Sequence, residues 1–193
     1  MKSSADSSPF LNYLKEHLGL FATLDVLDGE INSVIKICVS SLQNGGKLLF
    51  CGNGGSAADS QHLAAEFTGR FINDRKPIAA LSLTTDTSAL TCIGNDYSFS
   101  DIFLRQLQAL GKDGDCLFAI STSGNSSNVI QAVIAAKSMG IHTIGLLGNN
   151  GGELSKLCEY KIIVPSNTTA RIQEAHILIG HSICRGVEIG LNI

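Results

Sequence analysis

The sequence has no long apolar run, no excess of either charge and no closely spaced pair of cysteines, and each absence excludes a class of protein. No segment approaches the roughly 18 apolar residues of a membrane span, so no membrane partner is expected. The net charge of −3, from 14 basic and 17 acidic side chains, gives no reason to expect a nucleic-acid partner. At 193 residues, 44% of them hydrophobic, the chain is expected to form one soluble domain over residues 1–193.

The cysteines and the N-terminus predict a cytoplasmic protein. The six cysteines are scattered without C-x-x-C spacing, and several lie in apolar runs, where a free thiol behaves as a small hydrophobe. Reduced cysteines are therefore expected. Lys15, Glu16 and His17 interrupt the apolar residues of the N-terminal segment, so no signal peptide is predicted.

Apolar spacing predicts two helices in residues 1–45, after an irregular polar tail over residues 1–9. Five continuous apolar runs follow, the pattern of strands buried on both faces. The runs are Leu48–Cys51, Ile78–Leu83, Asp115–Ser121, His142–Gly148 and Tyr160–Pro165. The helices expected between and after them are Ala57–Arg70, Asp101–Leu110, Asn128–Gly140, Glu153–Leu157 and Arg171–Leu191. This alternation predicts an α/β core over residues 46–193 with a doubly wound, parallel five-stranded sheet. The N-terminal helices would pack either on a partner subunit or within the chain, and apolar spacing does not choose between these alternatives.

Two loops that follow strands are rich in groups that bind phosphate. In Gly52–Ser56, glycines let backbone N–H groups approach a ligand, and the helix that follows offers the positive end of its dipole. Ser121–Ser126 offers four hydroxyls and a glycine directly after the third predicted strand. Ligands of such sheets bind beyond the carboxyl ends of the strands, so we favour phosphate binding over ordinary loop composition.

A dinucleotide site is the rival interpretation of the first loop. Gly52, Gly54 and Ala57 fit the loose G-x-G-x-x-A fingerprint. However, no acidic residue ends the second predicted strand to bind a ribose, and some 45 residues precede the first strand. We discount the fingerprint, and no P-loop motif occurs.

Possible metal or acid/base groups lie on two predicted helices. His62 and Glu66 are four residues apart and share one helix face, although a surface ion pair is the commoner reason for such spacing. On the last helix, at about 100° per residue, His176 and His181 lie about 140° apart, on either side of Gln173. Gln173 could accompany either histidine, and helical geometry does not choose between them.

Four motifs together resemble the sugar isomerase (SIS) domain, and more closely the sedoheptulose 7-phosphate isomerases, also called phosphoheptose isomerases. They are CGNGGSAADSQHLAAEFTGRF, LTTDTSALTCIGNDYSF, ISTSGNSSNVI and TARIQEAHILIGH. The resemblance covers nearly the whole chain. It implies a flavodoxin-like sheet, a homotetramer that uses the N-terminal helices, and active sites between subunits. The implied reaction converts D-sedoheptulose 7-phosphate to D-glycero-D-manno-heptose 7-phosphate, the first step toward the heptose of lipopolysaccharide cores or other surface glycans.

The resemblance also assigns residues. It implies a zinc ion, one per subunit, bound by His62, Glu66, Gln173 and His181, which leaves His176 structural. The implied substrate contacts are Asn53, Gly54, Gly55, Glu66, Asn95, Asp96, Ser121, Thr122, Ser123, Ser126 and Gln173, with Ser56 and Arg70 as additions. Ala170 departs from the acidic residue that some relatives carry near the sugar.

For the isomerisation we assign Glu66 as base and His181 as acid, acting through an enediol. The metal would either hold groups in place or polarise the sugar oxygens, and the sequence leaves both roles open. The alternative is a non-catalytic SIS protein that binds the replication initiator. It would lack the acid/base pair, so the presence of both residues favours the enzyme. A sugar-phosphate-sensing regulator would carry a DNA-binding module, for which this chain has no room.

Overall fold

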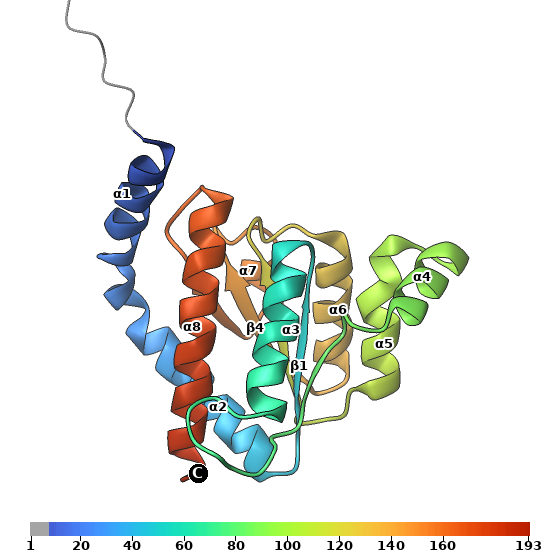
Figure 1. The fold of residues 1–193 in the computed structure, drawn as a ribbon. Coiled ribbons are helices and arrows are strands. Elements are labelled where there is room, and N and C mark those ends of the chain that lie inside the picture. The colour runs from blue at the N-terminus through green and yellow to red at the C-terminus, as the bar shows by residue number, and fades with distance from the viewer. Residues whose placement is uncertain (1–7) are drawn as a thin grey trace, which may run out of the picture.

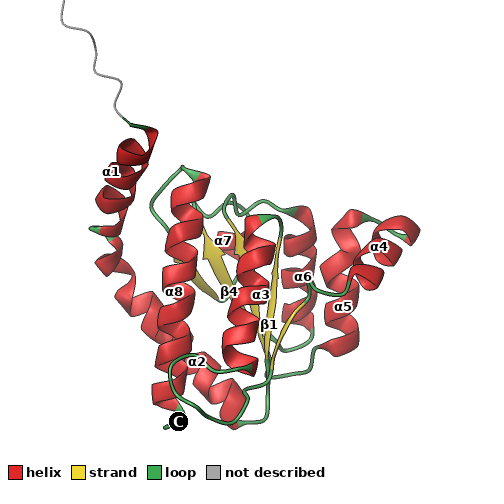
Figure 2. Ribbon diagram, in the orientation of Figure 1, coloured by secondary structure: helices red, strands yellow, loops and turns green. Residues whose placement is uncertain are grey.

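The computed structural model describes residues 8–193, which form a parallel sheet of five strands with helices on both faces (Figures 1 and 2). The strands are β1 (Leu48–Gly52), β2 (Ala80–Ser82), β3 (Cys116–Ser121), β4 (His142–Leu147) and β5 (Tyr160–Ile163). Their order is β2-β1-β3-β4-β5, and every neighbouring pair is parallel. This is the flavodoxin-like order, which confirms the predicted fold class.

Side chains of the central strands alternate between two apolar cores. In β1, Leu48 and Phe50 face one core, and Leu49 and Cys51 face the other. All five residues of β1 and all six of β3 are buried, because helices cover both faces of the sheet. The sequence shows continuous apolar runs for this reason.

Three long helices cover the first face and a second group covers the other. On the first face lie α2 (Asp28–Gln43), α3 (Gly55–Thr68) and α8 (Thr169–Gly190). On the second lie α4 (Thr87–Asp96), α5 (Ile102–Leu110), α6 (Ser127–Ser138) and α7 (Leu154–Leu157). Short 3₁₀ turns, Leu24–Leu27 and Phe99–Asp101, join neighbouring helices. Helix α3 therefore follows β1 on one face, whereas α6 follows β3 on the other.

Helix α1 (Pro9–Phe21) extends beyond the sheet beside the upper end of α8 (Figure 1). None of its side chains is buried, and its main contacts within the chain are made to α8. The predicted tail was placed too far into the chain, since Pro9 already begins this helix. The rest of that prediction, residues 1–7, lies outside the described residues.

The structure corrects two predictions about elements. Helix α4 was not predicted, although Asp86 caps it by accepting a hydrogen bond from the Ala89 N–H at 2.9 Å. The outer strands β2 and β5 are not buried on both faces. They are short, and each contains only one buried residue, because an edge strand has a neighbour on one side only.

All six cysteines are unpaired thiols, and every one except Cys92 is buried. Within residues 8–193, no helix combines the length and apolar character that crossing a membrane requires.

Candidate active site

The glycine loop (Gly52–Ser56) and the serine loop (Ser121–Ser126) lie side by side at one edge of the sheet, where the chain leaves β1 and β3. Strands β1 and β3 are neighbours, with Gly52 opposite Ile120, but their helices lie on opposite faces. The loops after the two strands therefore separate and leave a crevice at the carboxyl edge of the sheet. This is the switch point at which doubly wound proteins bind ligands.

A pocket of about 280 Å³ occupies this crevice. Most of the predicted substrate contacts line it. The lining residues are Asn53, Gly54, Gly55, Ser56, Ile120, Ser121, Thr122, Ser126, Thr169 and Gln173. Ile120 and Thr169 were not predicted. The pocket thus combines both loops with the first two turns of α8.

Glycines shape both loops by necessity. Gly54, at the start of α3, has φ of 57°, and Gly124 has φ of 68°, a left-handed backbone that other residues rarely adopt. A Cβ on Gly124 would also overlap the carbonyl group of Gly151. The serine loop therefore packs directly on the loop that follows β4.

Hydrogen bonds within the serine loop hold it in a turn. The Ser121 hydroxyl lies 3.1 Å from that of Ser126 and accepts the Gly124 N–H at 3.1 Å. The side chain of Ser126 does not cap α6, which begins at Ser127, but the Asn128 carboxamide oxygen accepts the Val129 N–H at 3.0 Å. The N–H groups before Val129 have no partner within the helix, and this end carries a partial positive charge, so it suits an anion.

Asn128 joins the two loops and was missed in the sequence. Its carboxamide and that of Asn53 exchange two hydrogen bonds, at 2.8 and 2.9 Å. Asn128 is 1% exposed, so this pair fixes the glycine loop to the first turn of α6. Only its place within the serine motif hinted at this role, because an asparagine in the first turn of a helix has no distinctive pattern.

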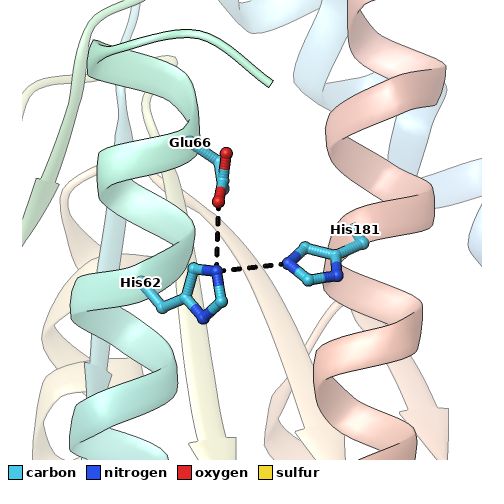
Figure 3. A group of neighbouring side chains, drawn as sticks. All are labelled: His62, Glu66 and His181. Carbon is cyan, nitrogen blue, oxygen red and sulfur yellow. Dashed lines mark hydrogen bonds and ion pairs between the residues drawn. The ribbon is translucent and has the colours of Figure 1, made fainter. Parts of the chain in front are cut away.

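A cluster of three side chains lies on α3 and α8, further from the N-terminal ends of these helices than the pocket (Figure 3). The His62 Nε2 atom lies 3.0 Å from a Glu66 carboxylate oxygen and 3.3 Å from the His181 Nε2 atom. The three ligand atoms lie within 4.8 Å of one another. The structure thus brings His181, and not His176, to the pair on α3.

This cluster has the donor chemistry of a metal site. A single His62 Nε2 atom faces a carboxylate, which needs a donor, and another imidazole nitrogen at the same time. One ring nitrogen has either one hydrogen or one lone pair in the plane of the ring. It can therefore make only one well-aligned hydrogen bond and cannot pair with both neighbours. A cation between the three atoms would satisfy all of them. Two imidazoles and a carboxylate are a common donor set for catalytic zinc.

The other predicted residues lie apart from this cluster. The Gln173 carboxamide packs against Gly55, seven residues or about 10 Å before His62 along α3. Ser123 lines a neighbouring hollow with Asn149 and Asn150. Asn95 and Asp96, at the end of α4, are exposed, hydrogen-bond to each other at 2.8 Å and do not line the pocket.

His176 and Arg70, the remaining candidates, belong to neither the pocket nor the cluster. His176 is 1% exposed and donates its Nε2 hydrogen to the Leu147 carbonyl at 3.0 Å. Burial lowers its pKa to about 4, partly offset by that hydrogen bond, so it is a neutral core residue. Arg70 is exposed and donates to the carbonyl of Ile72 at 3.3 Å, two residues further along the chain.

A flavodoxin-like sheet with a hydroxyl-rich pocket at its switch point defines a doubly wound α/β protein with a candidate ligand site, and comparison with known proteins specifies its family. The SIS domain matches residues 12–148. A phosphoheptose isomerase from Clostridium acetobutylicum is 55% identical over 82% of this chain and 81% of its own. One from Aliarcobacter butzleri is 52% identical over 86% and 87%. The solved phosphoheptose isomerase of Neisseria gonorrhoeae superposes with a TM-score of 0.89, at 44% identity, and the match covers 93% of this chain and 97% of that one.

The chain therefore belongs to the SIS domain family and, within it, to the phosphoheptose isomerases. It is an enzyme, an aldose–ketose isomerase that acts on a heptose phosphate.

Proposed function

We propose that the enzyme converts D-sedoheptulose 7-phosphate to D-glycero-D-manno-heptose 7-phosphate. This would be the first step toward the heptose of lipopolysaccharide cores or other surface glycans. The observation that carries the proposal is the placement of two chemically different sites along the same pair of helices. The pocket lies at the start of α3 and α8, and the cluster of His62, Glu66 and His181 lies about 10 Å further along them. That separation suits an extended seven-carbon sugar phosphate.

The phosphate would bind in the pocket. Hydroxyls of Ser121, Thr122 and Ser126 line it, and the N-terminus of α6 adds N–H donors. Asn53 and the glycines beside it would contact the sugar. Anchoring the phosphate would hold the reacting carbons against the cluster and so remove part of the entropic barrier to reaction.

Glu66 and His181 would carry the proton transfers at the other end. Glu66 would take the proton from the carbon beside the carbonyl, and His181 would supply a proton to the oxygens, through an enediol. One Glu66 oxygen faces His62, and Figure 3 shows the other turned away from it. One oxygen can thus remain in the cluster while the second acts as the base.

We further propose that the cluster binds one zinc ion through His62, Glu66 and His181, with Gln173 as the fourth ligand. When bound, zinc would supply positive charge that polarises the carbonyl and hydroxyl oxygens of the sugar or holds the acid/base pair in place. Gln173 would have to turn away from Gly55 to take part.

The enzyme would work as a cytoplasmic homotetramer with active sites between subunits. Phe10, Leu11 and Leu18 on α1 are each more than half exposed, which is unusual for a monomer. Asn95 and Asp96 do not reach the pocket of their own chain, so a contact with substrate would place them against another subunit.

The direct test is incubation of the purified enzyme with sedoheptulose 7-phosphate, with the aldose phosphate followed by NMR. Formation of the heptose phosphate is expected, and the activity should fall after chelation and return with Zn²⁺. A turnover confined to other sugar phosphates would refute the substrate. Full activity in metal-depleted protein would refute the zinc.

A further inference from the structure

A buried ion pair joins the ends of the two helices that carry the cluster. The Arg75 Nε atom lies 2.8 Å from a Glu188 carboxylate oxygen, and the two side chains are only 2% and 1% exposed. Glu188 lies on α8, seven residues after His181 and hence on about the same face of the helix. Arg75 lies in the segment that leaves α3 and curves beneath the ends of both helices (Figure 1).

The Arg75 guanidinium also closes the C-terminal end of α3. It donates to the carbonyl of Glu66 at 2.8 Å and to that of Phe67 at 2.9 Å. The last carbonyls of a helix lack partners within it, and the last turn of α3 contains no basic residue. Arg75 thus supplies both the missing donors and the positive charge that a helix C-terminus favours. One of its contacts is made to the backbone of the proposed base.

The Glu188 carboxylate is also linked to the cluster through Phe71. The backbone N–H of Phe71 lies close enough to stabilise the negative charge of this carboxylate, and the Phe71 ring lies against the His181 ring with 5.3 Å between centroids. Desolvation raises the pKa of Glu188, but the hydrogen bond and charge of Arg75, with the Phe71 N–H, lower it by more. The group is therefore a carboxylate at neutral pH, able to hold Arg75 on one side and Phe71 on the other.

We propose that Arg75 and Glu188 are positioning residues for the isomerisation, which set the separation and orientation of Glu66 and His181. Arg75 fixes the backbone of Glu66, Glu188 holds Phe71 against the His181 ring, and their ion pair ties α3 to α8. This rests on the proposed roles of Glu66 and His181. Neither residue touches the pocket, so the pair acts on the reacting groups and leaves phosphate binding alone.

The test uses Glu188→Gln and Arg75→Lys in the full-length protein, with kcat and KM for sedoheptulose 7-phosphate and the Kd for Zn²⁺. We expect kcat to fall about 10- to 100-fold and zinc binding to weaken by a similar factor, as for other groups that orient ligands from behind. KM should change by less than about threefold. The zinc titration, made on metal-depleted protein against a chromophoric chelator, needs no turnover.

Two matched controls separate positioning from stability. Arg185→Gln removes the other arginine near the same carboxylate, 3.4 Å away and 40% exposed, and should leave kcat unchanged. Asp115→Asn breaks a buried ion pair with Lys47 at the amino edge of the sheet, where Asp115 is 2% exposed. It should lower the melting temperature without lowering kcat.

A double variant, Arg75→Met with Glu188→Leu, covers the case in which single variants do not fold. Apolar side chains of similar size commonly replace a buried ion pair without loss of stability, but they cannot hold the Glu66 carbonyl or the Phe71 N–H. Low kcat in this folded variant would support positioning. Wild-type kcat and zinc affinity in it, or equal losses in Asp115→Asn, would overturn the proposal. Retained turnover in Glu66→Gln would instead refute the role of Glu66 itself.

Discussion

Glu66 is the residue on which the chemistry depends most directly. Its carboxylate is about one-fifth exposed, faces His62 and belongs to the cluster of possible metal ligands with His62 and His181. Glu66→Gln keeps the shape of the side chain but removes its capacity to accept a proton from carbon. We expect turnover to fall at least 1,000-fold, within the range for a general base that also holds a metal. The measurement is kcat by NMR.

The fold and the substrate affinity of this variant are measured as controls. Circular dichroism and the binding of sedoheptulose 7-phosphate by calorimetry should remain close to wild type, because the pocket is about 10 Å away. A variant that still turns over within tenfold of wild type would remove Glu66 as the base.

His176 should make the protein less stable in mild acid. Its pKa is about 4 in the folded state, against an ordinary 6.5, because burial disfavours the charged ring. The unfolded chain therefore binds an extra proton between these values, and stability falls as the pH drops through 6.5 toward 4. This one group should account for about 2 kcal/mol between about pH 7.5 and about pH 5.

Urea unfolding of wild type and His176→Gln at both pH values would measure this contribution. The glutamine can still donate to the Leu147 carbonyl but does not titrate. Its stability should vary less with pH, by the stated amount. Equal pH dependence in the two proteins would show that another group is responsible.

At this scale, regular spacing in the sequence predicted which side chains meet on one helix, but not across helices. Four-residue spacing places His62 beside Glu66. The choice of His181 came from family resemblance, because helical geometry alone left His176 open. Asn128, Arg75 and Glu188 were missed, since their partners lie 75 and 113 residues away in the chain. Contacts between distant elements leave no periodic pattern.

Among the elements, the serine loop with the start of α6 should govern affinity for the phosphate. Ser126 lines the pocket and its hydroxyl lies 3.1 Å from that of Ser121, whereas Ser123 lines the neighbouring hollow. We expect Ser126→Ala with Ser123→Ala to raise KM for the phosphorylated ketose about 10- to 100-fold, the value of a hydrogen bond to a charged group. Most of the effect should come from Ser126.

Steady-state kinetics of both single variants and the double variant would test this. Ser127→Ala is the matched control, because its hydroxyl pairs with that of Ser100 at 3.1 Å and does not line the pocket. An unchanged KM in the double variant would remove phosphate binding from this loop.

The elements themselves were predicted well where burial made their pattern regular. Strands β1 and β3 lie between two layers of helices, so their apolar runs are continuous and their positions were found. Helix α4 was missed because its ten residues include two threonines, a serine and a glycine, and only Ile93 among them is buried. Its cap at Asp86 was a usable signal. Asn95 and Asp96, at the exposed end of this helix, do not line the pocket.

For the whole molecule, strand order determines where the site forms. Because β1 and β3 are neighbours with helices on opposite faces, two loops separated by some 65 residues face one crevice. The sequence predicted a parallel doubly wound sheet from the alternation of elements. The order of the strands came only with the resemblance, since pairing between strands depends on packing that no local pattern records.

Helix α1 supplies the last test, which concerns assembly. Phe10 and Leu18 are 69% and 60% exposed, and their spacing of eight positions places them within about 80° on the helix surface. Within the chain Leu20 and Phe21 pack against the core, and His17 contacts Glu174 at 2.8 Å, but these contacts leave Phe10 and Leu18 uncovered. A second copy of the chain would cover that side and gain the free energy of its burial.

We therefore expect the wild-type protein to sediment as a tetramer and Phe10→Ser with Leu18→Ser to shift it to smaller species. Sedimentation velocity at several concentrations measures the shift, because dissociation by mass action grows on dilution. Lys15→Ser, at an exposed position on the same helix, is the control and should remain tetrameric. If the sites lie between subunits, kcat per chain should fall with the tetramer fraction. A double variant that stays tetrameric would place the interface elsewhere, and a fully active monomer would show that each chain holds a complete site.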